Sequence, residues 1–340
     1  MLESVDNLAE IRTGEPSAET TIVQSAPSPP TAPDAKSAGP ATKPLYPLAA
    51  VVPTQAGPDG IRFDFNRGCR VMLPARTEGT WRVRLRDLDT GNTLFQSENA
   101  GALVSSAKRW FVRFRIEVWL IEQEGAEPRP ILTHDYNPRD RDVLVQFPVG
   151  TLGDILAWFP YAARFAERHP DSRITCALSD KFVPLLRDAY PNLRLLTHEE
   201  LAEQRLADRM YATYSLGLFF NDTEHVNQPT DFRQVGLHRT AGYILGVDPI
   251  EEAPRIVLSD NTRPVAEPYV CIATQSSTQC KYWNNPNGWR EVVGFLKENG
   301  YRVICIDQKP LHGSGLIWNH IPHGTEDETG DRPLAERARK

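Results

Sequence analysis

Residues 143 to 158 read Val143-Leu144-Val145-Gln146-Phe147-Pro148-Val149-Gly150-Thr151-Leu152-Gly153-Asp154-Ile155-Leu156-Ala157-Trp158. The run starts with apolar, β-branched residues, which are typical of a buried strand. A loop punctuated by glycine follows, and apolar side chains then recur at helical spacing, at Ile155, Phe159, Ala162 and Ala166. The stretch therefore predicts a strand, a tight loop and a helix, which together open a βαβ unit.

Asp154 stands at the expected start of that helix. An aspartate there is a favoured N-cap, because its carboxylate accepts hydrogen bonds from free backbone N–H groups. The same position lies outside the carboxyl end of a parallel strand, where α/β proteins bind their ligands. The local pattern thus allows two roles for Asp154, a structural cap and a catalytic carboxylate.

Composition limits the class of protein. The chain of 340 residues is long enough for two or three domains, and its 40% hydrophobic content fits a globular protein. The net charge of -6 argues against general affinity for nucleic acid or an anionic membrane. The sequence also has no run near the ~20 apolar residues of a membrane-spanning helix, and its N-terminus lacks the features of a secretory signal. We therefore expect a cytoplasmic protein whose five scattered cysteines are reduced.

Changes in composition divide the chain into four expected parts. Residues 1–58 are rich in Pro, Ala and Ser and predict a disordered arm, because they bury too little apolar surface to offset the ordering entropy. Residues 59–141 predict a small antiparallel β-sandwich or barrel. Residues 142–265 predict a Rossmann-like domain, and residues 266–340 predict part of a second one. That second part shows only two recognisable strands, too few to bury both faces of a sheet, which favours a chain cut inside a domain.

The β-rich part contains a stripe of arginines. Arg82, Arg84 and Arg86 alternate with the apolar residues of one expected strand. Such a stripe either binds an anion or forms the solvated face of a sheet, and alternation by itself requires only a solvated face. In residues 142–265 we expect strands at 143–147, 174–178, 193–196 and 211–220, and helices at 155–168, 182–189 and 234–245.

A second loop carries groups that suit a diphosphate. Ser276, Ser277 and Thr278 follow the expected strand 269–273 and precede Lys281. Hydroxyls, backbone N–H groups and an ammonium group all bind phosphate oxygens, although the spacing is not that of a P-loop and an ordinary polar surface loop has the same composition. Asp307 ends the next strand, where it either binds ribose hydroxyls or is a surface acid.

These two loops resemble a known family. The stretch 150–158 is similar to the first strand–helix loop of ADP-heptose glycosyltransferases, and the stretch 275–286 is similar to the donor-diphosphate loop of their second domain. The resemblance is closest to the bacterial autotransporter heptosyltransferases, covers roughly residues 61–340, and includes the stretch 317–324. It implies an α/β protein of GT-B type, with a twin Rossmann-like body preceded by a small antiparallel β domain and the disordered arm.

The resemblance also implies an activity and a site. The expected reaction is protein O-glycosylation, in which heptose passes from ADP-heptose to Ser or Thr hydroxyls of self-associating autotransporter adhesins. Asp154 is the implied general base. The implied donor-binding residues are Thr151, Leu152, Gly153, Gln275, Ser277 and Lys281, joined by Asp307 from the strand pattern.

One feature of the family is missing from the sequence. The resemblance implies iron-binding cysteines beyond residue 305, but no cysteine follows Cys305. Four-thiolate sites need close cysteine pairs, so we expect no metal site and no cofactor in this chain, which resembles a form shortened at its C-terminus. The expected partners are ADP-heptose, an autotransporter adhesin and, in a full-length form, further copies of the same chain. The alternative is a non-catalytic, truncated subunit that binds autotransporter strands or acts as a scaffold.

Overall fold

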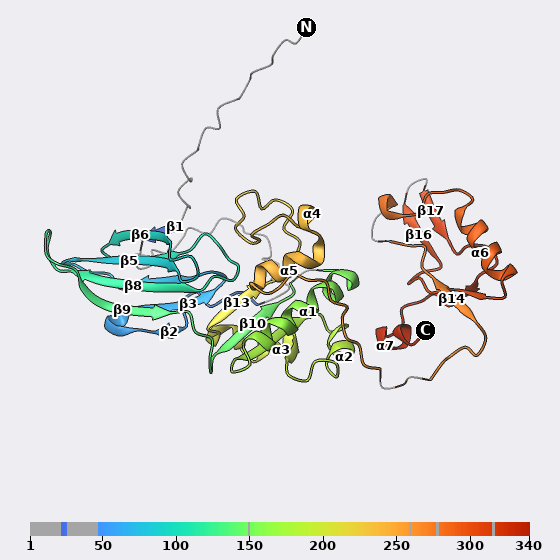
Figure 1. Cartoon of the computed structure of the whole chain (residues 1–340), viewed down its shortest axis with the longest axis horizontal. Helices are drawn as coiled ribbons and strands as arrows, with labels where there is room; N and C mark the ends of the chain where they lie inside the picture. The colour runs from blue at the N-terminus through green and yellow to red at the C-terminus, as the bar shows by residue number, and fades with distance from the viewer. Residues whose placement is uncertain are drawn as a thin grey trace, which may run out of the picture.

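The computed structural model of the protein describes residues 22–25, 47–148, 150–258, 260, 262–276, 279–314 and 317–340. Figure 1 shows a β-rich part, a middle α/β part and a C-terminal part, arranged along the long axis of the molecule in the order of the sequence.

The β-rich part contains an antiparallel sheet with the strand order β6-β5-β8-β9. One face of this sheet is apolar, as the period-two pattern predicts: Val83 of β5 lies opposite Val118 of β8, and both are fully buried. The strands are β5 (Thr80–Asp87), β6 (Thr93–Asn99), β8 (Phe114–Ile121) and β9 (Arg129–Asp135).

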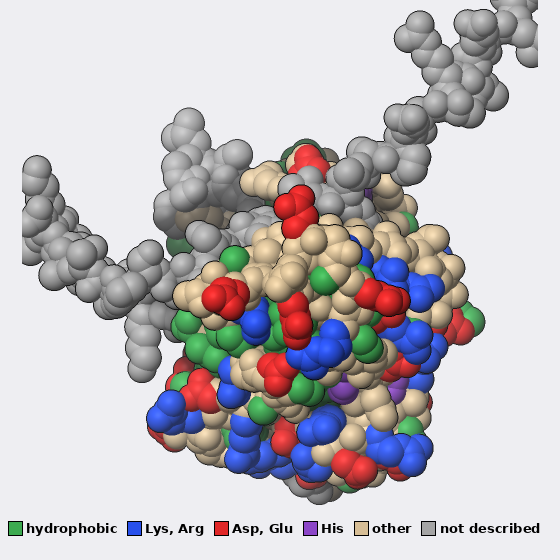
Figure 2. Space-filling model, turned by 90° about the vertical axis from the view of Figure 1, so that its left-hand side faces the viewer, with side chains coloured by type: hydrophobic (Ala, Val, Ile, Leu, Met, Phe, Trp, Pro, Cys, Tyr) green, Lys and Arg blue, Asp and Glu red, His purple; other side chains and the backbone are tan. Residues whose placement is uncertain are grey.

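The arginine stripe lies on the other face of this sheet. Arg82 donates a hydrogen bond to Glu98 at 2.7 Å, and Arg84 donates two to Glu117 at 2.8 and 3.0 Å. Figure 2 shows Lys and Arg side chains interspersed with Asp and Glu on this end of the molecule. Arg82 and Arg84 are thus paired with neighbouring carboxylates, and Arg86 donates to the carbonyl of Gly91. These partners favour the solvated-face interpretation of the stripe over an anion site.

The middle part has the parallel strand order β13-β10-β11-β12. Strand β10 lies inside the sheet, because Val143 pairs with Ile174 on one side and with Ala212 on the other. Helix α1 packs against helix α5, and Trp158 Nε1 of α1 donates a hydrogen bond to the carbonyl of Leu237 at 3.0 Å. The elements are β10 (Asp142–Gln146), α1 (Leu152–Arg168), β11 (Arg173–Leu178), α2 (Val183–Leu186), β12 (Arg194–Thr197), α3 (His198–Glu203), β13 (Ala212–Ser215), α4 (Phe232–Val235) and α5 (Leu237–Leu245), with the 3-10 turn η2 at Leu206–Arg209.

One sheet runs through the β-rich part and the middle part. Strand β3 pairs antiparallel with β4 and parallel with β13, where Asn66 lies opposite Thr213. Asn66 is buried and fixes this junction: its Nδ2 donates to the carbonyl of Met210 at 2.8 Å, and its Oδ1 accepts from Thr213 Oγ1 at 2.7 Å. The further elements here are β1 (Ile22–Ser25), β2 (Gln55–Ala56), η1 (Pro58–Gly60), β3 (Arg62–Asn66), β4 (Arg70–Leu73) and β7 (Ala102–Ser105).

The C-terminal part has its own parallel sheet, with the order β14-β15-β18. The third strand was not recognised in the sequence, because it contains only two residues and too few side chains to show a period. A separate antiparallel hairpin, β16–β17, follows β15. The elements are β14 (Tyr269–Ile272), η3 (Gln279–Lys281), α6 (Gly288–Glu298), β15 (Arg302–Cys305), β16 (Leu311–Ser314), β17 (Ile317–His320), β18 (Glu326–Asp327) and α7 (Leu334–Ala338).

The segment expected to be a disordered arm differs from that expectation where the structure describes it. Residues 22–25 form strand β1, which pairs with β7. Residues 47–58 contact the body: Gln146 Nε2 donates to the carbonyl of Pro47 at 2.9 Å, and Thr54 Oγ1 donates to that of Met210 at 2.7 Å. Proline-rich composition gave no signal for these contacts, because their partners lie about a hundred or more positions away in the sequence.

Two other boundaries are shorter than expected. Strand β13 covers Ala212–Ser215 rather than 211–220, and helix α2 covers Val183–Leu186 rather than 182–189. Element ends are the least certain part of any sequence pattern, because tertiary contacts set them. Across the described part of the chain, none of the helices combines the length and the apolar character needed to span a membrane.

Candidate active site

The first loop leads from β10 into α1. Thr151 is the N-cap residue of α1, and Asp154 is the third residue of the helix. Asp154 Oδ2 accepts hydrogen bonds from Thr151 N at 2.7 Å and from Thr151 Oγ1 at 2.9 Å. The expectation that Asp154 is itself the N-cap is therefore wrong: Asp154 reaches back to the cap residue, as the acidic member of a capping box does. Its side chain is half-buried, and Thr151, Leu152 and Gly153 are exposed beside it.

Gly150 allows this loop to turn. Its φ is +155°, which L side chains rarely adopt, and a Cβ placed there would lie 3.0 Å from Ile155 Cδ1 and 3.1 Å from Trp158 Cζ3. The side chains of Ile155 and Trp158 are buried, so neither has room to move away. The glycine thus lets the backbone pass close over the first turn of α1 and sets the position of Thr151.

The second loop follows β14, and the carboxylate of Asp307 fixes the first residues of this loop by hydrogen bonds. Asp307 is buried, with 5% of the residue exposed. Its Oδ2 accepts from Thr274 N and Thr274 Oγ1, both at 2.8 Å, and its Oδ1 accepts from Gln275 N at 3.1 Å. Cys305 Sγ lies 3.3 Å from the same Oδ2. Both carboxylate oxygens are occupied by the loop, so the geometry opposes the two expected roles of Asp307, a ribose ligand and a surface acid. It supports a role in positioning the loop.

The other donor-site candidates lie along this loop. Gln275 Nε2 donates to the carbonyl of Lys309 at 2.6 Å, which directs that side chain toward the protein. Lys281 is exposed at the end of the 3-10 turn η3. Ser277 lies outside the described residues. The structure therefore places Gln275 and Asp307 together and Thr151 and Asp154 together, each group at the carboxyl end of its own parallel sheet.

Sequence reasoning missed three residues around the second loop. Tyr282 is buried and shares a hydrogen bond with His312 Nδ1, and Asn319 Nδ2 donates to the carbonyl of Thr274 at 2.7 Å. The turn dipeptide Ser314-Gly315, which precedes the apolar pair Ile317-Trp318, was an available signal for a chain reversal. No sequence signal showed that the hairpin β16–β17 contacts the loop.

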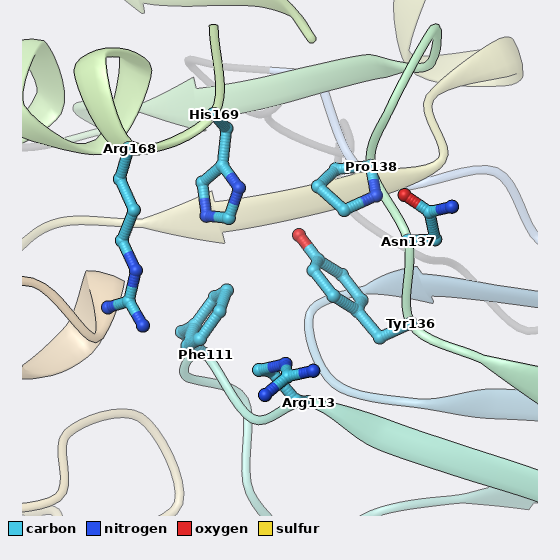
Figure 3. Close-up of a pocket in the computed structure, with 7 residues that line it drawn as sticks. All are labelled: Phe111, Arg113, Tyr136, Asn137, Pro138, Arg168 and His169. Atoms are coloured by element: carbon cyan, nitrogen blue, oxygen red, sulfur yellow. The ribbon is translucent and has the colours of Figure 1, made fainter. Parts of the chain in front are cut away.

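A cavity of about 320 Å³ lies at the other end of α1, away from Asp154. Figure 3 shows His169 and Tyr136 facing each other across it. Arg113 pairs with Asp89 at 2.7 Å, and Arg168 donates to the carbonyl of Gly246, so both cations already have partners. The lining residues are Phe111, Arg113, Tyr136, Asn137, Pro138, Arg168 and His169.

His169 makes the stability of the fold sensitive to acid. Burial, with smaller contributions from the charges of Arg168 and Arg113, lowers the pKa of His169 to about 4. Its Nε2 is buried and has no hydrogen-bond partner within the described part of the chain. Between about pH 6.5 and pH 4, the unfolded chain therefore binds a proton at this residue that the folded chain does not bind.

We expect the free energy of unfolding to fall as the pH drops through this window, and His169→Gln to remove part of that fall. Because His169 is only half-buried, solvent screening reduces the effect to on the order of 1 kcal/mol. Urea unfolding of the parent and of His169→Gln at several pH values between 7.5 and 4 measures the difference. Two parallel stability curves would contradict this role of His169.

Comparisons with known proteins place the chain in a family. The family model described as the N-terminal domain of glycosyltransferase TibC matches residues 57–122. The autotransporter heptosyltransferase BAHTCr of Citrobacter rodentium is 52% identical over 286 residues, which are 84% of this chain and 66% of the relative. The autotransporter heptosyltransferase TibC of Escherichia coli O78:H11 is 51% identical over 84% of this chain and 67% of the relative. The chain belongs to the autotransporter heptosyltransferase family.

The fold of this family member agrees with the solved structure of TibC. The crystal structure of TibC from enterotoxigenic E. coli superposes with a TM-score of 0.78 at 49% sequence identity, covering 86% of this chain and 73% of TibC. The expected α/β fold of GT-B type is thereby confirmed. TibC is described as dodecameric and iron-containing, and a second structure holds it in complex with ADP-D-beta-D-heptose. A further relative, BimC of Burkholderia thailandensis, is 43% identical over 76% of this chain and 58% of its own length, and is described as inactive.

This member of the family spans about two thirds of the length of BAHTCr and TibC. Its described residues do not fit an iron site, because they include no group of three or more His, Cys, Asp and Glu side chains that could hold a metal ion. Cys176 and Cys305 are buried in β11 and β15, and Cys69 is buried between β3 and β4.

Proposed function

We propose that this chain carries out the heptosyl transfer of its family, moving heptose from ADP-heptose to Ser or Thr hydroxyls of a self-associating autotransporter adhesin. The observation that carries the proposal is the first loop, in which a half-buried carboxylate is fixed at the carboxyl end of a parallel strand. Identity of about 50% to two heptosyltransferases supports the choice of reaction.

Asp154 is the proposed general base. Its Oδ2 is held by the two donors of Thr151, and none of the described residues donates a hydrogen bond to Oδ1. In this arrangement Oδ1 takes the proton of the acceptor hydroxyl, while the hydroxyl oxygen forms a bond to the anomeric carbon of the heptose. The bond from the anomeric carbon to ADP breaks, and ADP leaves with the electron pair. Thr151 thus orients the base, and the exposed Leu152 and Gly153 shape the surface beside it.

The second loop is the proposed donor site. Asp307 occupies the N–H groups of Thr274 and Gln275, so charge on the departing diphosphate must be stabilised further along the loop. The exposed Lys281 is suited to this role. Ser277 and the second Nε2–H of Gln275, beside the one that binds Lys309, are further proposed ligands. An ammonium group beside the leaving group stabilises the charge that develops there.

Lys281→Ala is expected to weaken ADP binding by about 1.5–3 kcal/mol, the usual contribution of a hydrogen bond to a charged group. The salt dependence of binding should fall as well, because one of the cations is removed. Lys297→Ala is the matched control: Lys297 is exposed in the same part of the chain and donates to the carbonyl of Gly324 at 3.1 Å. Titration calorimetry with ADP measures both variants, and an unchanged affinity of Lys281→Ala would remove this lysine from the donor site.

The function itself is tested with ADP-heptose and an adhesin fragment. We expect the chain to release ADP and to add heptose to the fragment, as measured by a coupled ADP assay and by intact-protein mass spectrometry. The second candidate is a non-catalytic subunit that binds autotransporter strands or acts as a scaffold, which the relative described as inactive favours. Binding of the adhesin fragment without ADP release or added mass would support that second candidate.

The remaining assignments are part of the same proposal. Assembly with further copies of this chain is proposed because TibC is dodecameric. The cytoplasmic location and the absence of a metal site stay predictions from the sequence. The boundaries of the four parts also stay predictions. The pairing of β3 with β13 joins the second and third of these parts in one sheet, which the boundaries did not foresee.

A further inference from the structure

The hairpin β16–β17 presents one cross-strand pair to the second loop. His312 of β16 lies directly opposite Asn319 of β17 in the antiparallel register. Opposed residues of an antiparallel pair project from the same face of the hairpin. The side chains of His312 and Asn319 can therefore contact the same neighbouring segment of the chain.

That neighbour is the loop between β14 and α6, which the two side chains hold near its start, at Thr274, and again just after η3, at Tyr282. Asn319 Nδ2 donates to the carbonyl of Thr274 at 2.7 Å, two positions after the end of β14. His312 Nδ1 shares a hydrogen bond with the hydroxyl of Tyr282, the residue after Lys281. Thr274 is 4% exposed and Tyr282 is 7% exposed, so water cannot readily replace either partner.

The segment that leads into the hairpin adds two contacts of its own. Asp307 binds the N–H groups of Thr274 and Gln275, and the carbonyl of Lys309 accepts from Gln275 Nε2. The start of the loop is thus fixed by Asp307 and, from the hairpin, by Asn319. The part of the loop beside Lys281 is fixed through Tyr282.

We propose that the His312–Asn319 pair is a positioning device that fixes the donor-diphosphate loop at Thr274 and Tyr282, on either side of Lys281, and so orients Lys281 for ADP. This inference rests on the proposed function, since it takes the loop to be the donor site. Presetting a loop raises affinity because less ordering entropy is lost when the ligand binds. His312, Asn319 and Tyr282 are positioning residues, and none of them needs to touch the ligand.

The test measures ADP affinity by titration calorimetry in the full chain. Asn319→Ala and Tyr282→Phe are each expected to weaken ADP binding roughly 5- to 10-fold, the effect of one lost hydrogen bond. In the double variant the two losses should combine to less than their product, because the first release already frees part of the loop. His312→Asn should retain more affinity than His312→Ala, because an amide can still reach the Tyr282 hydroxyl.

Asn299→Ala is the matched control. Asn299 Nδ2 also donates to a backbone carbonyl at 2.8 Å, that of Phe295, but at the exposed end of α6. We expect this variant to bind ADP as the parent does. Parent-like affinity in Asn319→Ala and Tyr282→Phe, or an equal loss in Asn299→Ala, would overturn the proposal.

A second measurement separates this inference from the proposed function. Hydrogen exchange without ADP should quicken at the amides of Thr274 and Gln275 in Asn319→Ala, and should stay at the parent rate in Asn299→Ala. If the parent chain does not bind ADP, the proposed function fails, while the exchange rates still decide whether the hairpin holds the loop. Unchanged exchange in Asn319→Ala would contradict the holding role.

Discussion

Asp154→Asn is expected to lower the rate of heptose transfer by roughly 100-fold or more, the usual contribution of a general base. The amide has nearly the same shape as the carboxylate, and its oxygen can still accept from Thr151 N and Thr151 Oγ1, which Asp154 Oδ2 does in the parent. It cannot take a proton at neutral pH. The fold and the affinity for ADP should therefore stay near those of the parent, while transfer to the adhesin fragment slows.

The chain itself offers a matched control for the structural role. Helix α3 begins with the same arrangement: Thr197 N donates to Glu200 Oε2 at 2.8 Å, and Glu200 N donates to Thr197 Oγ1 at 3.0 Å. Glu200→Gln removes the acid from this second capping box and should leave transfer unchanged. If Asp154→Asn transfers heptose at the parent rate, Asp154 is not the base. If it melts well below the parent, the cap is the main role of this residue.

Asp64→Ala is expected to destabilise the fold by about 3–5 kcal/mol, the usual cost of leaving a buried ion-pair partner unpaired. The carboxylate of Asp64 is fully buried and accepts from Arg70 Nε at 2.8 Å and from Arg70 Nη2 at 2.6 Å. It also accepts from Thr54 N at 3.0 Å and from Asn66 Nδ2 at 2.8 Å. Alanine removes the acceptor for all of these donors at the junction of β3 and β13.

Asp135→Ala is the matched control for this effect. Arg115 donates to Asp135 at 2.6 and 2.8 Å, the same two-pronged geometry, but the side chain of Asp135 is 44% exposed. Exposed pairs are screened by water, so this variant should lose much less stability than Asp64→Ala. Urea unfolding, followed by fluorescence and by far-ultraviolet circular dichroism, measures both. Equal losses in the two variants would show that the junction network of Asp64 adds nothing beyond an ordinary ion pair.

The shared sheet also shapes how Asp64→Ala should unfold. Because β3 pairs with β13 and both parts contribute to one hydrophobic core, we expect the β-rich part and the middle part to unfold in a single transition. The two spectroscopic signals should therefore coincide in the parent and in the variant.

Local patterns in the sequence predicted the elements that depend on local periodicity. The alternation around Trp81 and Val83 predicted strand β5, and the spacing of Ile155 and Phe159 predicted helix α1. The motif around Gly150 and Asp154 also placed the first loop correctly, because a tight strand–helix turn needs glycine within a few residues.

Pairings between distant segments were not predictable in this way. The parallel register of Asn66 with Thr213 joins two parts that composition separates, and it depends on residues 147 positions apart. Asp307 has the sequence pattern of a strand-terminal acid, but in the fold its carboxylate accepts a hydrogen bond from Thr274 at the start of the second loop. Asp154 was expected at the N-cap, and a shift of three positions changes its partners from the free N–H groups of the following helical turn to Thr151.

The sequence by itself determined the strands and helices with a clear local period, the α/β class and the two loops that carry the proposed chemistry, because periodicity and glycine placement are local properties. Only the tertiary structure decided how those loops are held. The contacts of Asn319 with Thr274 and of His312 with Tyr282 join residues 45 and 30 positions apart. Such contacts exist only after the hairpin packs beside the loop, and the packing is set by the whole surrounding core rather than by any short stretch of sequence.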